Sequence, residues 1–295
     1  MYSGAFDYAA PTSLGETLQL LQTAQPEGSE VKLLAGGQSL IPLIKLRLAQ
    51  PALLVDLRQV AELRGIAEEG GGVVLGAATT YFQAIDSELV RRRCPLLVQA
   101  IRQVGDPQVR ARGTIGGSLA HADPAGDLPA VAVALGATIR TVGPNGQREI
   151  AAGDFFVELL TTALQPSEII TAVRFPATNQ PGMGAAYVKH RHPASGYAVV
   201  GVAAVVRLGA GGTCAEARLG LTGAASHARR LASVEQVLAG KPLNDATVAA
   251  ACASAADGLD LLSDTYASAE YRAHLTRVLT KRAVLQAALA ALGQA

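Results

Sequence analysis

Apolar residues in the first half of the chain recur with two periods, one helical and one typical of extended strands. A leucine repeat at helical spacing follows Ser13 and Glu16, which are spaced as a capping box, so a short helix ending near Pro26 is predicted. Largely apolar segments at 31–36 and 52–57 predict buried strands on either side of a glycine-rich stretch. Further predicted elements are a strand at 73–80, helical segments over 81–103 with a break at Cys94 and Pro95, a helix at 128–137 and a hairpin over 138–150. The first half is therefore predicted to mix helices and strands.

The second half begins after residues 177–184, which concentrate proline, glycine and polar residues and are the best candidate for a linker. Three strands are predicted at 184–192, 197–208 and 214–223, with a glycine-rich turn joining the last two. Three helices are predicted to close the chain. In the last of them the predicted apolar face holds Tyr271, Leu275, Val278 and Leu279, and the predicted solvated positions are Arg272, Arg277 and Lys281. We therefore expect a meander covered by a helical layer.

Composition narrows the class of protein. Hydrophobic residues make up 49% of the chain and charged residues 17%, which is a globular balance. The formal net charge is +1, so no overall field favours nucleic acid or an anionic membrane. No apolar run is long enough to span a bilayer and no signal peptide is recognisable, so a cytoplasmic protein without membrane insertion is expected. Cys94, Cys214 and Cys252 are too far apart to hold an iron–sulfur cluster or a zinc knuckle by themselves.

Two glycine-rich segments carry the candidate chemistry, one over Ala35–Ser39 and one over Arg112–Asp127. Paired glycines let the backbone turn with positive φ and present successive N–H groups, which bind phosphate oxygens without a cationic side chain. The alternative is that each segment is only a tight turn. Neither segment is a Rossmann fingerprint, a P-loop or a nucleophile elbow, so a classical NAD site, an ATPase site and acyl-transfer hydrolysis have no support.

Taken together, the two glycine-rich segments resemble those of a known protein family. The sequences LLAGGQSLIPLIKLRLAQPALLVDL and DPQVRARGTIGGSLAHADPAGDLPA, in this order and spacing, resemble the FAD-binding medium subunit of the molybdenum hydroxylases. That family includes carbon monoxide dehydrogenase, aerobic N-heterocycle dehydrogenases and the flavin domain of xanthine dehydrogenase. The resemblance implies an α+β fold. A PCMH-type FAD-binding domain of the vanillyl-alcohol-oxidase type is expected over 1–178, with two subdomains split near 58–70, followed by a C-terminal domain over 183–295 with a three-stranded antiparallel sheet and helices.

The resemblance also assigns residues to FAD. Backbone amides of both glycine segments are expected to surround the pyrophosphate, and these residues are Ala35, Gly36, Gly37, Gln38, Ser39, Thr114, Ile115, Gly116, Gly117 and Ser118. Asp127, or Asp123 by the carbon monoxide dehydrogenase pattern, is expected to bind the ADP ribose. Ile170 is expected near the adenine or the flavin edge, Lys189 beside the isoalloxazine and Tyr197 over one of its faces. Ser118 departs from the family, which usually has asparagine there.

Two other pairs of residues each allow two interpretations. His190 and His192 alternate on a predicted strand, where they form either a metal site or, as we prefer, a basic edge. His121 and Asp123 form either an acid–base pair or a loop beside the cofactor, and the second reading fits electron transfer better. No metal site and no catalytic residue is therefore assigned to this chain.

The function implied by the resemblance is that of an electron-relay subunit. Its expected partners are a large subunit with the molybdenum cofactor and a small subunit with two [2Fe-2S] clusters, assembled as a dimer of heterotrimers. Two alternatives remain open: a self-sufficient FAD-dependent oxidoreductase of the same fold acting on its own small substrate, and a non-enzymatic interaction module. Neither the substrate nor the terminal acceptor is specified by the sequence.

Overall fold

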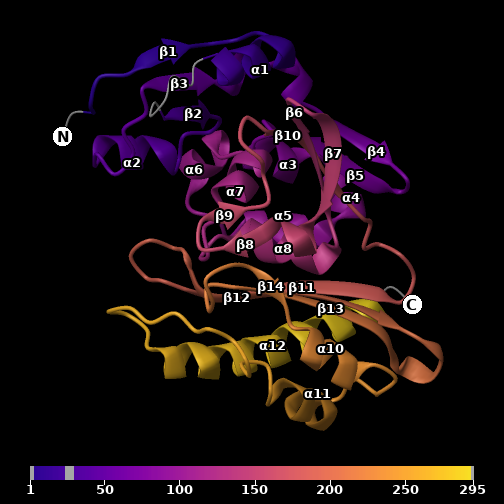
Figure 1. The fold of residues 1–295 in the computed structure, drawn as a ribbon. Helices are drawn as coiled ribbons and strands as arrows, with labels where there is room; N and C mark the ends of the chain where they lie inside the picture. The colour runs from indigo at the N-terminus through magenta and orange to yellow at the C-terminus, as the bar shows by residue number, and fades with distance from the viewer. Residues whose placement is uncertain (1–2, 24–29, 294–295) are drawn as a thin grey trace.

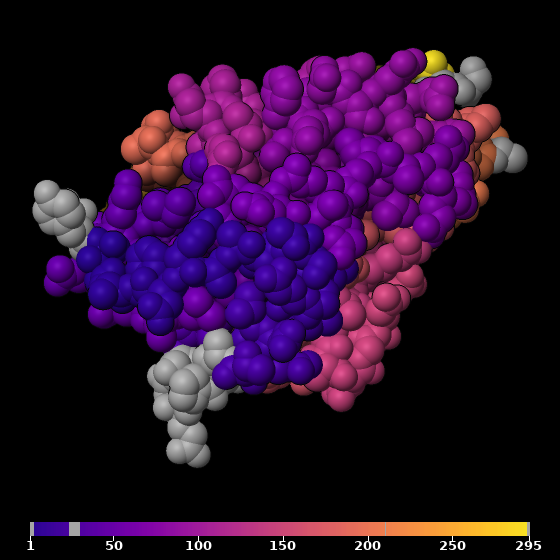
Figure 2. All heavy atoms as spheres, turned by 90° about the horizontal axis from the view of Figure 1, so that it is seen from above, coloured from indigo at the N-terminus to yellow at the C-terminus, as the bar shows by residue number. Residues whose placement is uncertain are grey.

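The computed structural model describes residues 3–23 and 30–293, and the predicted end of the first helix near Pro26 lies outside these ranges. Figure 1 shows a small sheet at the top, a larger sheet with helices below it, and a third sheet with its own helices at the bottom. Seen from above, the indigo N-terminal segment and the purple segment after it cover most of one face (Figure 2). The fold is α+β, as expected.

The first sheet is parallel and has the strand order β1-β3-β2. Helix α1 joins β1 to β2, and helix α2 follows the first glycine segment. Pro42 lies in the first turn of α2, where a missing N–H costs no helical hydrogen bond. The elements are β1 (Asp7–Ala9), α1 (Leu14–Thr23), β2 (Val31–Leu34), α2 (Leu40–Lys45) and β3 (Leu53–Asp56).

The second sheet is antiparallel with the order β4-β5-β10-β6-β7. Strand β10 lies between β5 and β6, although it follows both in the chain. The predicted hairpin is present as β6 and β7. Its strands are β4 (Ile66–Glu69), β5 (Gly72–Gly76), β6 (Thr138–Gly143), β7 (Gly146–Ala151) and β10 (Ile169–Phe175). The short strands β8 (Phe156–Glu158) and β9 (Thr161–Thr162) form a separate two-stranded sheet.

Short helices cover the second sheet and lead to the second glycine segment. The helical stretch predicted over 81–103 breaks at Cys94 as expected and also at Ser87, whose hydroxyl accepts a hydrogen bond from Val90 and caps the next helix. The helices are α3 (Tyr81–Asp86), α4 (Glu88–Arg93), α5 (Pro95–Ile101), α6 (Pro107–Arg112), α7 (Ile115–His121), α8 (Asp127–Leu135) and α9 (Ala152–Phe155), with the 3-10 turns η1 (Leu57–Gln59) and η2 (Ala61–Leu63) before β4.

The third sheet contains the three predicted antiparallel strands and a two-residue fourth strand at one edge. Helix α8 packs on one face and α12 on the other, so the middle strand β12 is apolar almost throughout (Figure 1). Glycines allow this close packing, because a Cβ on Gly220 would lie 2.0 Å from the Ala130 carbonyl and one on Gly184 2.0 Å from the Ala287 carbonyl. The elements are β11 (Met183–Arg191), β12 (Ala198–Leu208), η3 (Ala210–Gly212), β13 (Cys214–Thr222), β14 (Arg229–Arg230), α10 (Ala232–Leu238), α11 (Asp245–Cys252) and α12 (Ala269–Leu292).

One predicted surface position is wrong. Arg272 is buried, and its guanidinium donates to the carbonyl oxygens of Val199 and Gly223, each at 2.7 Å, while pairing with Asp264. Val199 and Gly223 lie just beyond the paired residues of β12 and β13, so the guanidinium donates to two carbonyls that the strand ladder leaves without a partner strand. Tyr271, predicted on the apolar face, is partly exposed instead. Within the described ranges no helix has the length and apolar character needed to cross a membrane.

Candidate FAD site

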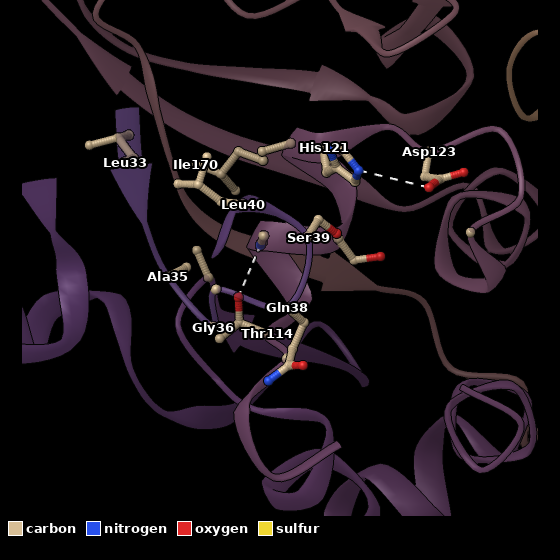
Figure 3. A pocket seen from close by; sticks show the side chains of 18 of the residues that line it. Leu33, Ala35, Gly36, Gln38, Ser39, Leu40, Thr114, His121, Asp123 and Ile170 are labelled. Atoms are coloured by element: carbon tan, nitrogen blue, oxygen red, sulfur yellow. Dashed lines mark hydrogen bonds and ion pairs between the residues drawn. The ribbon is translucent and has the colours of Figure 1, made fainter. Parts of the chain in front are cut away.

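A cavity of about 690 Å³ opens between the first sheet, the second sheet and the loop before β12. Figure 3 shows the first glycine segment, the start of α7 and Ile170 of β10 around it. Segments far apart in the sequence therefore line one cavity, as expected for the binding site of a ligand.

The first glycine segment turns the chain between β2 and α2. Gly37 has φ of +75°, a conformation that glycine adopts without strain. A Cβ on Gly36 would lie 2.2 Å from the carbonyl oxygen of Arg112, so the first glycine segment rests directly on the second. Within the described residues nothing accepts from the backbone N–H groups of Gly37, Gln38 and Ser39. These amides are available to an anion in the cavity.

The second glycine segment differs from expectation because its amides are already engaged. The N–H of Ile115 donates to Thr79, that of Gly116 to Ala77, and those of Gly117 and Ser118 to Thr114. The bond from Gly117 to the Thr114 hydroxyl caps α7 and is drawn in Figure 3. The unengaged backbone amides that could bind an anion therefore belong to the first segment. The second segment lines the cavity, and its amides are used within the protein.

Two carboxylates follow the second segment and differ sharply in environment. Asp123 lies half-buried in the cavity wall, where one oxygen accepts from Ala125 N at 2.8 Å and the other lies 3.8 Å from His121 Nε2 (Figure 3). Asp127, the first residue of α8, is buried. It accepts from the Tyr187 hydroxyl at 2.5 Å and lies 2.9 Å from the Lys189 ammonium.

Lys189 lies behind Asp127 rather than in the cavity wall. Its side chain is 1% exposed, and its ammonium also donates to the carbonyl oxygen of Gln103 at 3.1 Å. Burial raises the pKa of Asp127, while Lys189 and Tyr187 oppose that rise. This buried group joins α8 and the end of α5 to β11, and so ties the C-terminal sheet to the wall of the cavity.

Two tyrosines connect the cavity to the glycine segments. Tyr197 precedes β12, is 44% exposed and lines the cavity together with Ser39, which lies near its side chain. Tyr81, at the start of α3, is buried in the wall near the Ser118 side chain. Burial raises the pKa of both phenols, so both stay protonated near neutral pH.

The comparisons with known proteins bear on this geometry. Residues 4–178 match the family model described as the FAD binding domain in molybdopterin dehydrogenase, and residues 185–287 match the CO dehydrogenase flavoprotein C-terminal domain. The first match alone covers more than half of the chain. The chain belongs to the family of FAD-binding medium subunits of molybdenum hydroxylases. It is an oxidoreductase subunit, and it contains the FAD-binding domain of that family.

Named relatives of this family cover nearly the whole chain. The carbon monoxide dehydrogenase medium chain of Hydrogenophaga pseudoflava is 41% identical over 95% of this chain and 96% of its own. The xanthine dehydrogenase FAD-binding subunit of Escherichia coli O157:H7 is 30% identical over 98% of this chain and 99% of its own. A solved carbon monoxide dehydrogenase from H. pseudoflava superposes with a TM-score of 0.93 at 40% identity, covering 100% of this chain and 99% of the other. Quinoline 2-oxidoreductase from Pseudomonas putida 86 gives 0.91 at 34% identity, with coverages of 99% and 100%.

The residues of the cavity fit FAD. The family's cofactor carries a pyrophosphate, and three unengaged amides meet at a turn where glycine allows close approach of a ligand. The cavity lies within the size range of cofactor sites. Thirteen of the fifteen residues assigned from the sequence line it, and Ile115 and Lys189 do not: Ala35, Gly36, Gly37, Gln38, Ser39, Thr114, Gly116, Gly117, Ser118, Asp123, Asp127, Ile170 and Tyr197. Their individual contacts with FAD stay predictions.

Sequence reasoning missed Glu168, which lines the cavity next to Ile169. Both of its oxygens lie 2.7 Å from Arg148, and they also accept from Thr141 and the backbone of Gln165. These donors lower the pKa of Glu168 to about 2. The signal in the sequence was a single acid before an apolar strand, which is too common to stand out.

The remaining candidates are separate from the cavity. The His190 ring lies 6.1 Å from that of Tyr271, and the His192 ring 4.4 Å from that of Tyr266. No group of three metal-ligating side chains exists among the residues that the structure describes.

Proposed function

We propose that this chain is the electron-relay subunit of a heterotrimeric molybdenum hydroxylase. In that role it holds FAD between a [2Fe-2S] subunit and a terminal acceptor. FAD, when bound, supplies a centre that exchanges electrons singly or in pairs. The chain's own residues bind and orient the cofactor and control access to it. The proposed partners are a large subunit with the molybdenum cofactor and a small subunit with two [2Fe-2S] clusters.

One observation carries the proposal. The first glycine segment presents unengaged amides into a cavity that the second segment, β10 and the loop before β12 complete. We propose that Gly37, Gln38 and Ser39 donate to the pyrophosphate oxygens. Several relatives are named as one subunit among others, including the nicotine 6-hydroxylase medium subunit of Paenarthrobacter nicotinovorans, which is 36% identical over 96% of this chain.

The two carboxylates take different roles in this proposal. Asp123 keeps one oxygen free of hydrogen bonds from the described residues, so it is the better acceptor for an ADP ribose hydroxyl. Asp127 has both oxygens engaged by Tyr187 and Lys189, so it holds the wall in place. Tyr197 covers the isoalloxazine end, and Ile170 gives an apolar contact. Domain limits at 1–178 and 183–295 and a dimer of heterotrimers belong to the same proposal.

Affinity purification of the tagged chain from its native host tests this function. The proposal expects two companion chains, together with molybdenum and four iron atoms per FAD if the small subunit holds two [2Fe-2S] clusters. A lone flavoprotein that turns over a small substrate at the same rate with and without companions would instead support the self-sufficient oxidoreductase. A colourless chain that binds other proteins would support the interaction module.

A further inference from the structure

A second cavity, of about 290 Å³, lies where the segment between β10 and β11 passes from the second sheet to the third. Figure 1 shows this segment crossing at one edge of the molecule. Four arginines from four elements line this cavity and are called the arginine cavity below: Arg93 of α4, Arg174 of β10, Arg207 of β12 and Arg218 of β13. Two come from the FAD-binding half and two from the C-terminal half. Neither the cofactor site nor any comparison accounts for this convergence.

The nearby carboxylates satisfy only part of the hydrogen-bonding capacity of these guanidiniums. Glu216 is the one carboxylate in the described lining, and it lies 3.5 Å from Arg207 and 3.2 Å from Arg218 without hydrogen bonds to them. Outside the lining, Glu68 pairs with Arg93. Glu69 is chiefly bonded to Arg140, and it lies 3.7 Å from Arg174.

Each guanidinium carries five N–H donors, and few of them are used here. Among the described residues, the four arginines make two hydrogen bonds, one from Arg93 to Glu68 and one from Arg218 to the Leu135 carbonyl. Arg93 Nε is buried without a partner within those residues. Arg174 and Arg207 make none with them, and the Arg207 side chain is 47% exposed. Asn179 and Gln180, whose side-chain amides are able to donate, are also among the lining residues.

We propose that the arginine cavity binds a small phosphate-bearing anion. Guanidinium forks match the geometry of phosphate oxygens, and a polyvalent anion can engage several forks at once. The bound anion bridges Arg93 and Arg174 to Arg207 and Arg218. It therefore links the two halves of the chain next to the segment that joins them. Free phosphate, pyrophosphate and the phosphate group of a nucleotide share this chemistry.

The test uses the full chain loaded with FAD, so that the cofactor cavity is not a competing site. Isothermal titration with pyrophosphate, at ionic strength matched with chloride, measures binding to the wild type and to the variants Arg174→Gln and Arg207→Gln. Arg91→Gln is the control, because Arg91 is an exposed arginine of the same helix as Arg93 and lies outside the cavity. We expect each cavity variant to weaken binding about tenfold and the control to leave it unchanged.

Thermal unfolding gives the second readout. Saturating pyrophosphate should raise the Tm of the wild type by about 5 °C, and the cavity variants should lose that rise. If Arg174→Gln does not fold, the proposal is tested with Arg207→Gln alone, because Arg207 is the more exposed of the two arginines and its replacement should disturb the fold less. If ADP binds more tightly than pyrophosphate and depends on the same arginines, the natural ligand is a nucleotide. If ADP and pyrophosphate bind with equal affinity, the natural ligand is a free phosphate or pyrophosphate. Equal pyrophosphate affinity in wild type and all variants, or no binding beyond the chloride control, would overturn the proposal.

Discussion

Asp123 lies in the loop before α8 and Asp127 is the first residue of that helix, yet only Asp123 keeps an oxygen free of hydrogen bonds from the described residues at the cavity wall. Asp127 is committed to Tyr187 and Lys189. The two carboxylates should therefore separate in function. Asp123→Asn is expected to weaken FAD binding about tenfold without lowering stability, because one charge-assisted acceptor is lost. Fluorescence titration with FAD measures this, and unchanged affinity would remove Asp123 from the site.

Asp127→Asn is expected to act on stability first. It leaves the Lys189 ammonium buried without its counter-charge, which should cost about 3 kcal/mol in the free energy of unfolding. Urea unfolding followed by circular dichroism measures this loss. The matched variant Lys189→Met should restore part of the stability when combined with Asp127→Asn, since no buried charge is then left alone. Simple addition of the two losses would contradict the paired role.

Gly36→Ala tests the contact between the two glycine segments. The added methyl would meet the Arg112 carbonyl at 2.2 Å, so the segments must separate, and FAD affinity should fall about tenfold or more. Gly15→Ala is the control, because a Cβ there has no neighbour closer than 4.0 Å and lies in α1. The ratio of FAD to protein after gel filtration reports the result. Full retention of FAD by Gly36→Ala would contradict the geometry.

Ser118→Ala examines the position where the family usually has asparagine. The Ser118 side chain lies near the buried Tyr81 hydroxyl and opposes the rise of its pKa, so the substitution removes a polar neighbour of that phenol. The free energy of unfolding should fall by about 1–2 kcal/mol. Ser118→Asn is the informative partner variant. A gain in FAD affinity with asparagine and no loss of stability would indicate that this position faces the cofactor.

Acid stability should depend on Glu168. Its pKa falls from the ordinary 4.5 to about 2 in the folded chain, so the stabilisation is present above pH 4.5 and is lost as the pH falls toward 2. The loss should be about 2 kcal/mol, reduced from the full value because Arg148 is partly exposed. Glu168→Gln should remove this pH dependence. Urea unfolding at several pH values between these limits provides the test, and an unchanged slope in the variant would exclude Glu168.

Local patterns in the sequence predicted most elements, because strands and helices with one buried face repeat their apolar residues at fixed periods. They did not predict contacts between distant segments. The amides of Ile115 and Gly116 are taken by Thr79 and Ala77, which no local pattern reveals. Arg272 appeared solvated from its spacing, and only the end of the third sheet explains its burial.

For the cofactor site, too, the local features were predictable from the sequence and the contacts between distant segments were not. The paired glycines predicted a tight turn and an anion-binding backbone, and the resemblance added FAD. Placing Lys189 requires knowing that β11 packs against α8 and α5, which is a tertiary relationship. Glu168 was missed because its partners Thr141 and Arg148 lie on the β6–β7 hairpin, 20 or more residues before it in the chain.

The central claim is that the cavity beside Gly36 and Gly37 holds FAD. The most direct measurement is the visible absorption spectrum of the purified chain after incubation with FAD and gel filtration, both alone and co-expressed with its proposed partner chains. The account predicts about one FAD per chain in at least one of these preparations, with no iron–sulfur absorbance from the chain alone. A chain that takes up no FAD in either preparation would contradict it.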